Sequence, residues 1–466
     1  MDAQTLKEEL FNQKRSGWEK ISNDDKNNIF QFAEEYMYYL NHSKTEKEIV
    51  ESSKEILIKN NFKDIKTVSE LHPGDRIFFV NKNRNIFAAV IGEDPITTGL
   101  RVVAAHADSP RIDLKQNPLY ENSGFAYLKT HYYGGIRKYQ WATIPLAMHG
   151  LIVKSNGDKI NITYGEDETE PTLMITDLPP HLSQAQDERK LKEGITGEEL
   201  NIMVGSIPYS NENISEKIKL NVLNILNEKY GIKEIDFTTS ELEFVPAFKA
   251  RSMGFDSSMV ASYGQDDKVC SYTALRGILN LRNPKKTAIC VLTDREEVGF
   301  MGVSGMESRI FETFILEILE KRNENSPNAL NKAFSNSKAL SADVDAAQDP
   351  NYPDVFDKYN SSKLGHGVCI VKYGGARGKS GSSESPAEFV AEVKKIFDEN
   401  NISYHSSELG KVDKGGGGTI ALTLANRGME VLDCGVPILC MHSPYEICSK
   451  YDIYQAYRAY EAFYKG

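Results

Sequence analysis

Two adjacent glutamates, Glu296 and Glu297, follow an apolar run in "LTDREEVGF", which extends from Leu292 to Phe300. The preceding residues, "TAICVL", are typical of a strand that is buried on both faces. In open α/β sheets, ligands bind at the carboxyl ends of the strands. Neighbouring carboxylates in a buried pocket repel each other, which drives at least one towards its protonated form. A divalent cation that binds one carboxylate removes this conflict and leaves the other free to accept a proton from water.

Imidazole and carboxylate groups recur at the ends of other apolar runs. They are His106 and Asp108 in "AHADSP", Asp267 in "GQDDKV", Asp343 in "SADVDAA" and His442 in "MHSP". Each motif is weak alone, because a His-x-Asp pair is often structural and adjacent glutamates are usually solvated. The chain has nine histidines, and two of them follow apolar runs. Imidazole and carboxylate ligands suit zinc, and two such ions can share a bridging carboxylate, so the set predicts a metal site.

A nucleotide site is the alternative. In "VCIVKYGGARGKS" an apolar strand enters a glycine-rich loop with Gly378, Lys379 and Ser380. A P-loop requires a glycine five residues before this triplet, a position that Tyr373 occupies here. The nearest glycine, Gly374, leaves the loop one residue short. The pattern therefore favours nucleotide hydrolysis less than metal chemistry. The glycine run at 415–418 fits either a close approach of backbone to substrate or a tight turn.

The elements that must position these residues alternate between strand and helix in much of the chain. The first sixty residues and the stretches 215–231, 308–322, 385–400 and 450–464 predict helices. Strands are predicted at 75–80 and 86–92, as a hairpin, and at 100–106, 287–293, 339–344, 366–373, 402–408 and 430–435. This alternation predicts an α/β fold, a mainly parallel sheet with helices on both faces. Short β-rich segments over 117–248 predict an inserted domain, which leaves 1–116 and 249–466 as a discontinuous catalytic domain.

Composition excludes several classes of protein. The net charge of −11 over 466 residues argues against a nucleic-acid binder, which needs a basic surface. No apolar run is long enough to cross a membrane, and the amino terminus shows no signal peptide. The six cysteines lie mostly in apolar runs without metal-ligand spacing, which indicates buried free thiols in a reducing compartment. We therefore expect a cytoplasmic protein.

Five ordered motifs, taken together, resemble those of the aspartyl aminopeptidase and aminopeptidase I family of two-metal peptidases. They are "AAHADSPR", "YGQDDKVCSY", "TDREEVGF", "SADVDAAQDPNYPD" and "CGVPILCMHSP". The resemblance implies an α/β catalytic domain with an inserted dimerisation domain, and removal of the amino-terminal residue from peptides. It also implies two zinc ions per subunit, which cobalt or manganese can replace. An inactive protein with the peptidase fold is a further alternative.

The resemblance assigns a role to each candidate residue. One metal would be bound by His106 and Asp343, the other by Glu297 and His442, and Asp267 would bridge them. Glu296 would be the general base and then the acid that protonates the leaving amine. Asp108 would accept a hydrogen bond from His106 and fix its tautomer.

The resemblance extends to the inserted domain. His181, in "DLPPHLSQ", matches a histidine that in the family reaches the neighbouring subunit's active site, so a homodimer is implied, within a larger tetrahedral dodecamer. This chain departs from the family in three places: the usual Arg-Leu-Asp-Asn reads Gln265 to Lys268, the histidines usual after the Asp343-type ligand are absent from "DVDAAQDPNY", and "YYGGIRKYQWATIPLA" keeps the glycines but lacks the Trp-Phe-Asp-Arg-Asp run. These departures favour a neutral or broad substrate preference over an acidic one.

Overall fold

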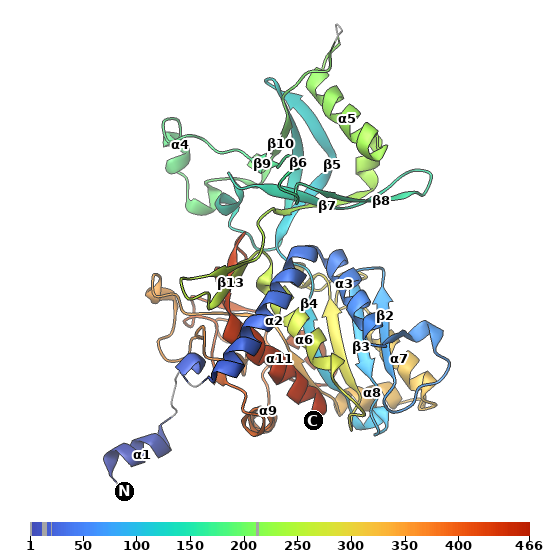
Figure 1. Cartoon of the computed structure of the whole chain (residues 1–466), viewed down its shortest axis with the longest axis vertical. Coiled ribbons are helices and arrows are strands. Elements are labelled where there is room, and N and C mark those ends of the chain that lie inside the picture. Colours follow the sequence, from blue (N-terminus) through green and yellow to red (C-terminus); the bar gives the residue numbers. More distant parts are fainter. Residues whose placement is uncertain (1, 12–15, 20, 211–213) are drawn as a thin grey trace.

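The computed structural model describes residues 2–11, 16–19, 21–210 and 214–466. The chain forms two lobes (Figure 1). The larger lobe contains both ends of the chain, and the smaller lobe is built from the middle of the sequence. Among the described residues, no helix has both the length and the apolar character needed to cross a membrane.

A nine-stranded sheet forms the centre of the larger lobe. Its strands, in spatial order, are β1 (Lys63–Asp64), β2 (Arg76–Asn81), β3 (Asn85–Val90), β14 (Ala288–Thr293), β4 (Arg101–His106), β15 (Lys338–Ser341), β21 (Glu430–Gly435), β17 (Val368–Val371) and β19 (Tyr404–Ser406). Five of its eight neighbouring pairs are parallel, and three are antiparallel. The consecutive parallel strands β14, β4, β15 and β21 lie at its centre, so their carboxyl ends meet at one edge.

Helices cover both faces of this sheet, which confirms the α/β class. Alternate strand residues enter two separate hydrophobic cores; Val103 and Leu292 lie in one, and Val102 and Val291 in the other. The first core is completed by α2 (Asn23–His42), α3 (Glu46–Lys59), α6 (Gln265–Leu279), α9 (Ala387–Glu399) and α11 (Lys450–Lys465). The second is completed by α7 (Ile310–Lys321), α8 (Ala329–Ser335) and α10 (Ala421–Ala425). The run "TAICVL" is therefore buried on both faces, as its composition predicts.

Local signals explain several of these elements. Thr45 and Glu48 form a reciprocal capping box at the start of α3, which satisfies amides that the helix leaves free. Residues 82–84 connect β2 to β3, with Lys82 and Asn83 at positive φ, in the hairpin that the sequence predicts. Five of the six free cysteines are buried, as expected, and Cys440 is exposed.

A seven-stranded sheet forms the smaller lobe. Its order is β8 (Lys159–Tyr164), β7 (Leu146–Val153), β11 (Ser240–Pro246), β5 (Arg111–Asn122), β6 (Phe125–Tyr133), β10 (Ile202–Gly205) and β9 (Met174–Ile175). Every neighbouring pair among these described strands is antiparallel. The helix α5 (Lys217–Tyr230) packs against it through Ile218 and Val222. These strands span 111–246, compared with the predicted range of 117–248.

Two smaller sheets complete the larger lobe. A five-stranded sheet contains β12 (Arg251–Met253), β13 (Met259–Ser262), β23 (Glu446–Ser449), β22 (Pro437–Leu439) and β16 (Asp345–Ala346). In the other, β18 (Gly375–Ala376) pairs with β20 (Gly416–Gly417). Two further short helices are α1 (Ala3–Leu10) and α4 (Gln184–Asp187).

The glycine-rich segment with Lys379 does not form a P-loop. Ala376 and Ser380 exchange backbone hydrogen bonds of 3.0 and 2.9 Å, which closes a tight hairpin. The next helix, α9, begins only at Ala387. A phosphate site requires the glycine loop to lead directly into a helix amino terminus, so the geometry does not support the nucleotide alternative.

Candidate metal centre

One cavity of about 280 Å³ lies at the carboxyl edge of the central sheet. His106 ends β4, while the two glutamates and Asp343 follow β14 and β15. The position agrees with the rule that ligands bind beyond the carboxyl ends of parallel strands. Six of the residues lining the cavity bring metal-ligand atoms close together in groups of three: His106, Asp266, Glu296, Glu297, Asp343 and His442.

Asp266, rather than Asp267, lies between the two histidines. Its Oδ1 is 3.2 Å from Nε2 of His106, and its Oδ2 is 3.1 Å from Nε2 of His442. The side chain of Asp267 has a different partner, because its Oδ2 accepts the backbone N–H of His106 at 3.2 Å. Asp267 is also absent from the cavity lining. The structure therefore places the side chain of Asp266 in the cavity, where the sequence analysis expected that of Asp267.

This difference has a local cause in the backbone that precedes the regular part of α6. Asp266 and Asp267 have non-helical dihedral angles, and the two carboxylates point to different neighbours. Burial raises the pKa of the Asp267 carboxyl well above its usual range. Burial also opposes ionisation of Asp266, but hydrogen bonds with His106 and His442 outweigh it and hold its pKa below the usual range.

The remaining candidates form two groups that share Asp266. One contains His106, Asp266 and Asp343, and the other contains Asp266, Glu297 and His442. Nε2 of His106 lies 3.8 Å from Oδ1 of Asp343, and Nε2 of His442 lies 3.4 Å from Oε1 of Glu297. Ligand atoms about 2.0–2.2 Å from a tetrahedral zinc ion lie roughly 3.4 Å from one another. The spacing and the donor types therefore fit a metal in each group.

Glu297 provides a further observation in favour of a cation. Its Oε1 is buried and has no hydrogen-bond donor among the described residues. A buried carboxylate oxygen without a partner is costly unless a ligand satisfies it. Burial and the charge of Asp266 raise the pKa of Glu297 well above its usual range. Both features are relieved when a divalent cation binds there.

Glu296 shares the cavity without lying between the histidines. Its carboxylate is close to His106 and Glu297. Burial raises its pKa to about 8, with the negative charges of Asp343 and Asp108 adding to the effect. A carboxyl group with a pKa near neutrality suits proton transfer at physiological pH.

Asp108 positions other residues of the site through hydrogen bonds. Its carboxylate accepts the backbone N–H groups of Glu296 and Glu297 at 3.1 and 3.2 Å. Nδ1 of His106 is 3.0 Å from the backbone oxygen of Asp108 and 3.4 Å from its carboxylate. The residue thus orients His106 chiefly through its main chain, and its side chain holds the glutamate turn.

Glu446 is a supporting residue that the sequence analysis missed. It is buried, and its two carboxylate oxygens accept the backbone N–H groups of His442 at 2.7 Å and Asp266 at 3.1 Å. One side chain thus fixes the main chain at both members of the Asp266–His442 pair. The available signal was its position four residues after His442 in "MHSPYE".

His181 is not brought to this cavity within one chain. It is exposed, lies just before α4 in the smaller lobe and is not among the cavity-lining residues (Figure 1). Arg377, Lys379 and Lys414 are also exposed and do not line the cavity. Lys379 pairs with Glu384 at 3.1 Å.

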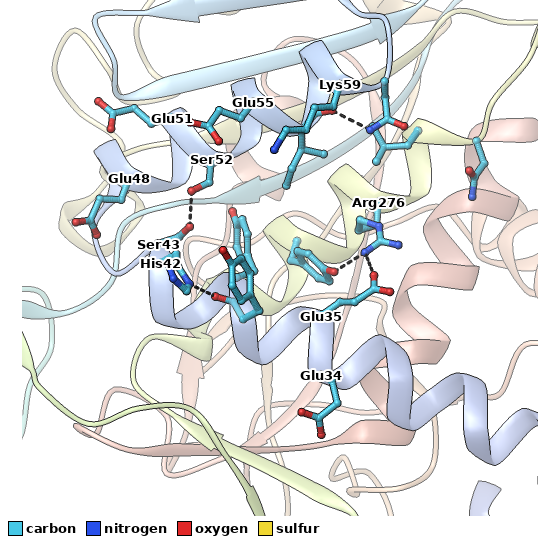
Figure 2. A pocket seen from close by; sticks show the side chains of 17 residues that line it. Glu34, Glu35, His42, Ser43, Glu48, Glu51, Ser52, Glu55, Lys59 and Arg276 are labelled. Carbon is cyan, nitrogen blue, oxygen red and sulfur yellow. Dashed lines mark hydrogen bonds and ion pairs between the residues drawn. The ribbon is translucent and has the colours of Figure 1, made fainter. Parts of the chain in front are cut away.

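A larger groove of about 990 Å³ lies elsewhere, between α2, α3 and α6 (Figure 2). Carboxylates including Glu51 and Glu55 line it, and Arg276 forms an ion pair with Glu35. Of the described residues, those of the groove contribute no group of three close metal-ligand atoms. The groove therefore lacks the close metal-ligand groups that the smaller cavity contains.

Comparisons with known proteins identify the family. The model of the family described as "Aminopeptidase I zinc metalloprotease (M18)" matches residues 39–464. The chain belongs to this family. A "Probable M18 family aminopeptidase 1" from Clostridium acetobutylicum is 45% identical over 459 residues, which cover 98% of this chain and 99% of the relative. The crystal structure of an M18 aminopeptidase from Thermotoga maritima has a TM-score of 0.94 at 41% identity and covers 98% of this chain and 100% of that one.

A more distant yeast structure, described as the mApe1 dodecamer, shares the fold. Its TM-score is 0.76 at 19% identity, with coverage of 94% of this chain and 97% of that one. The family membership confirms the zinc aminopeptidase prediction, and the nucleotide-hydrolase alternative finds no support.

Proposed function

We propose that the cavity holds two zinc ions and removes the amino-terminal residue from peptides. The observation that carries this proposal is the position of Asp266, whose two oxygens face one histidine each at 3.2 and 3.1 Å. One ion is bound by His106, Asp266 and Asp343, and the other by Asp266, Glu297 and His442. When bound, the metals supply Lewis acidity, which polarises the scissile carbonyl and lowers the pKa of water.

Glu296 performs the proton transfers in this proposal. Its carboxylate takes a proton from the attacking water and returns that proton to the leaving amine. Asp108 holds the amide of Glu296 at 3.1 Å, so the carboxylate is presented from a fixed turn. Glu297, which follows in the same turn, is a ligand rather than a base because it faces His442.

The cavity supports a neutral amino-terminal residue as substrate. Among the described residues, those that line it include six carboxylates and no lysine or arginine. An acidic side chain would find no fixed positive side chain to pair with there. Val344, Val371, Leu409 and Met441 provide an apolar surface instead.

We also propose that the smaller lobe mediates a homodimer in which His181 completes the partner's active site. Three exposed leucines, Leu178, Leu182 and Leu191, lie near His181 in the sequence and provide an apolar surface for such contact. The yeast structure that shares the fold is described as a dodecamer, which supports a larger assembly of dimers. Six unpaired cysteines are consistent with a cytoplasmic location.

Metal removal tests the proposed reaction. Dialysis against a chelator should abolish hydrolysis of leucyl anilide and of peptides, and zinc, cobalt or manganese should restore it. Undiminished activity in protein shown to be metal-free would refute the proposal. Protein that binds two zinc ions but hydrolyses no substrate would identify an inactive member of the family. In a panel of anilides, a preference of about a hundredfold for aspartate over leucine would refute the neutral substrate class.

A further inference from the structure

Three consecutive residues of the smaller lobe reach the candidate metal centre. The hydroxyl of Tyr133, the last residue of β6, donates a hydrogen bond of 2.7 Å to Oδ2 of Asp108. A Cβ atom on Gly134 would lie 3.3 Å from the Glu297 carboxylate, so this backbone packs against that ligand. The backbone oxygen of Gly135 is 3.1 Å from Nδ1 of His442, whose Nε2 faces the cavity.

The hydrogen bond from Tyr133 acts on the residue that holds the glutamate turn. Asp108 is fully buried, and its carboxylate accepts the Tyr133 hydroxyl together with the amides of Glu296 and Glu297. A hydroxyl bonded to an ionised carboxylate makes a strong, directional contact. The orientation of Asp108, and through it that of both glutamates, therefore depends on a side chain from the other lobe.

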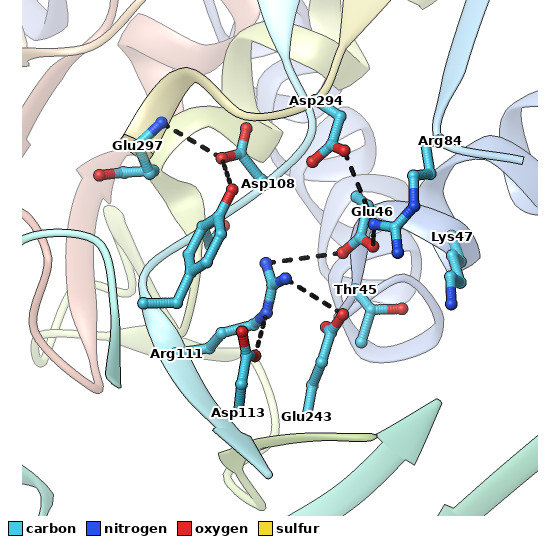
Figure 3. A network of polar contacts seen from close by, with 12 residues as sticks. Thr45, Glu46, Lys47, Arg84, Asp108, Arg111, Asp113, Glu243, Asp294 and Glu297 are labelled. Atoms are coloured by element: carbon cyan, nitrogen blue, oxygen red, sulfur yellow. Dashed lines mark hydrogen bonds and ion pairs between the residues drawn. The ribbon is translucent and has the colours of Figure 1, made fainter. Parts of the chain in front are cut away.

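The ring of Tyr133 is itself held in place. The Arg111 guanidinium lies 3.9 Å from the ring centroid. Arg111 pairs with Asp113 at 2.9 Å and Glu243 at 3.2 Å in the smaller lobe, and with Glu46 at 3.6 Å in the larger lobe (Figure 3). Charged partners from both lobes fix this guanidinium, so Tyr133 rests on a rigid support.

We propose that Tyr133 is a positioning residue for the metal centre and that it acts through Asp108. The inference rests on the proposed two-metal site. Gly135 positions His442 directly. Its carbonyl accepts the Nδ1 proton of His442, which leaves Nε2 free to bind a cation. The smaller lobe thus supplies part of the support of the metal ligands of its own chain.

Tyr133→Phe tests the proposal, because it removes the hydroxyl and keeps the ring beneath Arg111. Residues that orient metal ligands typically change metal affinity or activity about 10- to 100-fold when altered. Zinc affinity, measured by competition with a chromophoric chelator, should fall within this range, and kcat should fall with little change in KM. Tyr132→Phe is the matched control: Tyr132 is adjacent and 40% exposed, so both quantities should stay within about twofold of wild type.

A second variant separates positioning from general damage to the fold. In an Asp108→Asn background, adding Tyr133→Phe should change zinc affinity by less than about twofold, because the group through which Tyr133 acts is already altered. Full additivity of the two effects would overturn the proposal, as would wild-type zinc affinity in folded Tyr133→Phe. The affinity measurement does not require turnover. If the wild-type protein binds two zinc ions without hydrolysing peptides, the proposed function fails while the role of Tyr133 is still decided.

Discussion

Asp266→Asn and Asp267→Asn replace one oxygen by nitrogen at neighbouring positions, and we expect the first to weaken metal binding strongly and the second to change it little. Asp266 belongs to both ligand groups, so its substitution weakens both sites at once. Oδ2 of Asp267 accepts the backbone N–H of His106, and asparagine retains an oxygen to accept that N–H.

The magnitude follows from the number of ligands. Zinc bound by four protein ligands gains about 10–16 kcal/mol, which is roughly 2.5–4 kcal/mol per ligand. Loss of the shared carboxylate should therefore raise Kd by about 10² to 10³ at each of the two sites. For Asp267→Asn, we expect a change of about threefold or less, because neither ligand group loses a member.

Zinc content after equilibrium dialysis, with competition against a chelator for affinity, separates the two variants. Asp266→Asn should retain less than one ion per chain under conditions that give two in the wild type, and its peptidase activity should disappear. Asp267→Asn should retain both ions and most of the activity. Stoichiometric zinc in folded Asp266→Asn, or loss of both ions in Asp267→Asn, would show that the bridge has been assigned to the wrong residue.

Three further predictions concern the base, the domain junction and the dimer. Glu296→Gln should keep both metals and lose about 10² to 10⁴ in kcat, so a near-normal kcat with full zinc content would refute its role as base. His149 lies between Glu48 at 2.7 Å and Glu166 at 3.0 Å; burial opposes its protonation, but these carboxylates raise its pKa to about 9. Protonation of His149 therefore stabilises the fold fully below about pH 6.5, and this contribution of about 3 kcal/mol is lost progressively as the pH rises to about 9. In His149→Ala, the free energy of unfolding measured with urea should vary less with pH over that range, whereas His131→Ala should keep the wild-type pH dependence. His181→Ala should lower kcat without zinc loss, and mixed dimers with Glu296→Gln should regain up to half of wild-type activity; confirmed mixed dimers without recovery would place His181 in its own chain's site.

The helices and strands of the larger lobe could be predicted because their apolar patterns are long and regular. The run "TAICVL" becomes β14 with alternate residues in two cores, and the helix of 308–322 appears as α7 at Ile310–Lys321. The candidate metal-ligating residues include His106, Glu296, Glu297 and Asp343, which lie at or just after the ends of these strands, so their spacing in the sequence could indicate much of the cavity. Lys379 shows the limit of the same approach, since a strand followed by glycines is compatible with a hairpin as well as with a phosphate loop.

The bridging residue could not be predicted because two adjacent aspartates present the same chemistry in the sequence. Their roles differ through backbone direction alone: one carboxylate faces two imidazoles, and the other accepts an amide behind the site. Glu446 and Tyr133 escaped detection for another reason. Both act through hydrogen bonds to other residues, so their type does not mark them as functional; for Glu446 the signal in the sequence is its position four residues after His442.

The contacts of the smaller lobe explain why the glycines of "YYGG" persist where the following residues depart from the family pattern. Gly134 has φ of +73°, which disfavours a side chain, and a Cβ there would also press against Glu297. Gly135 approaches His442 closely enough for its carbonyl to accept the Nδ1 proton. These constraints come from the metal ligands, which the chain retains. The residues after the glycines do not line the cavity. The two glycines and the residues after them are therefore under different constraints. The residues after the glycines can change without disturbing the candidate metal site.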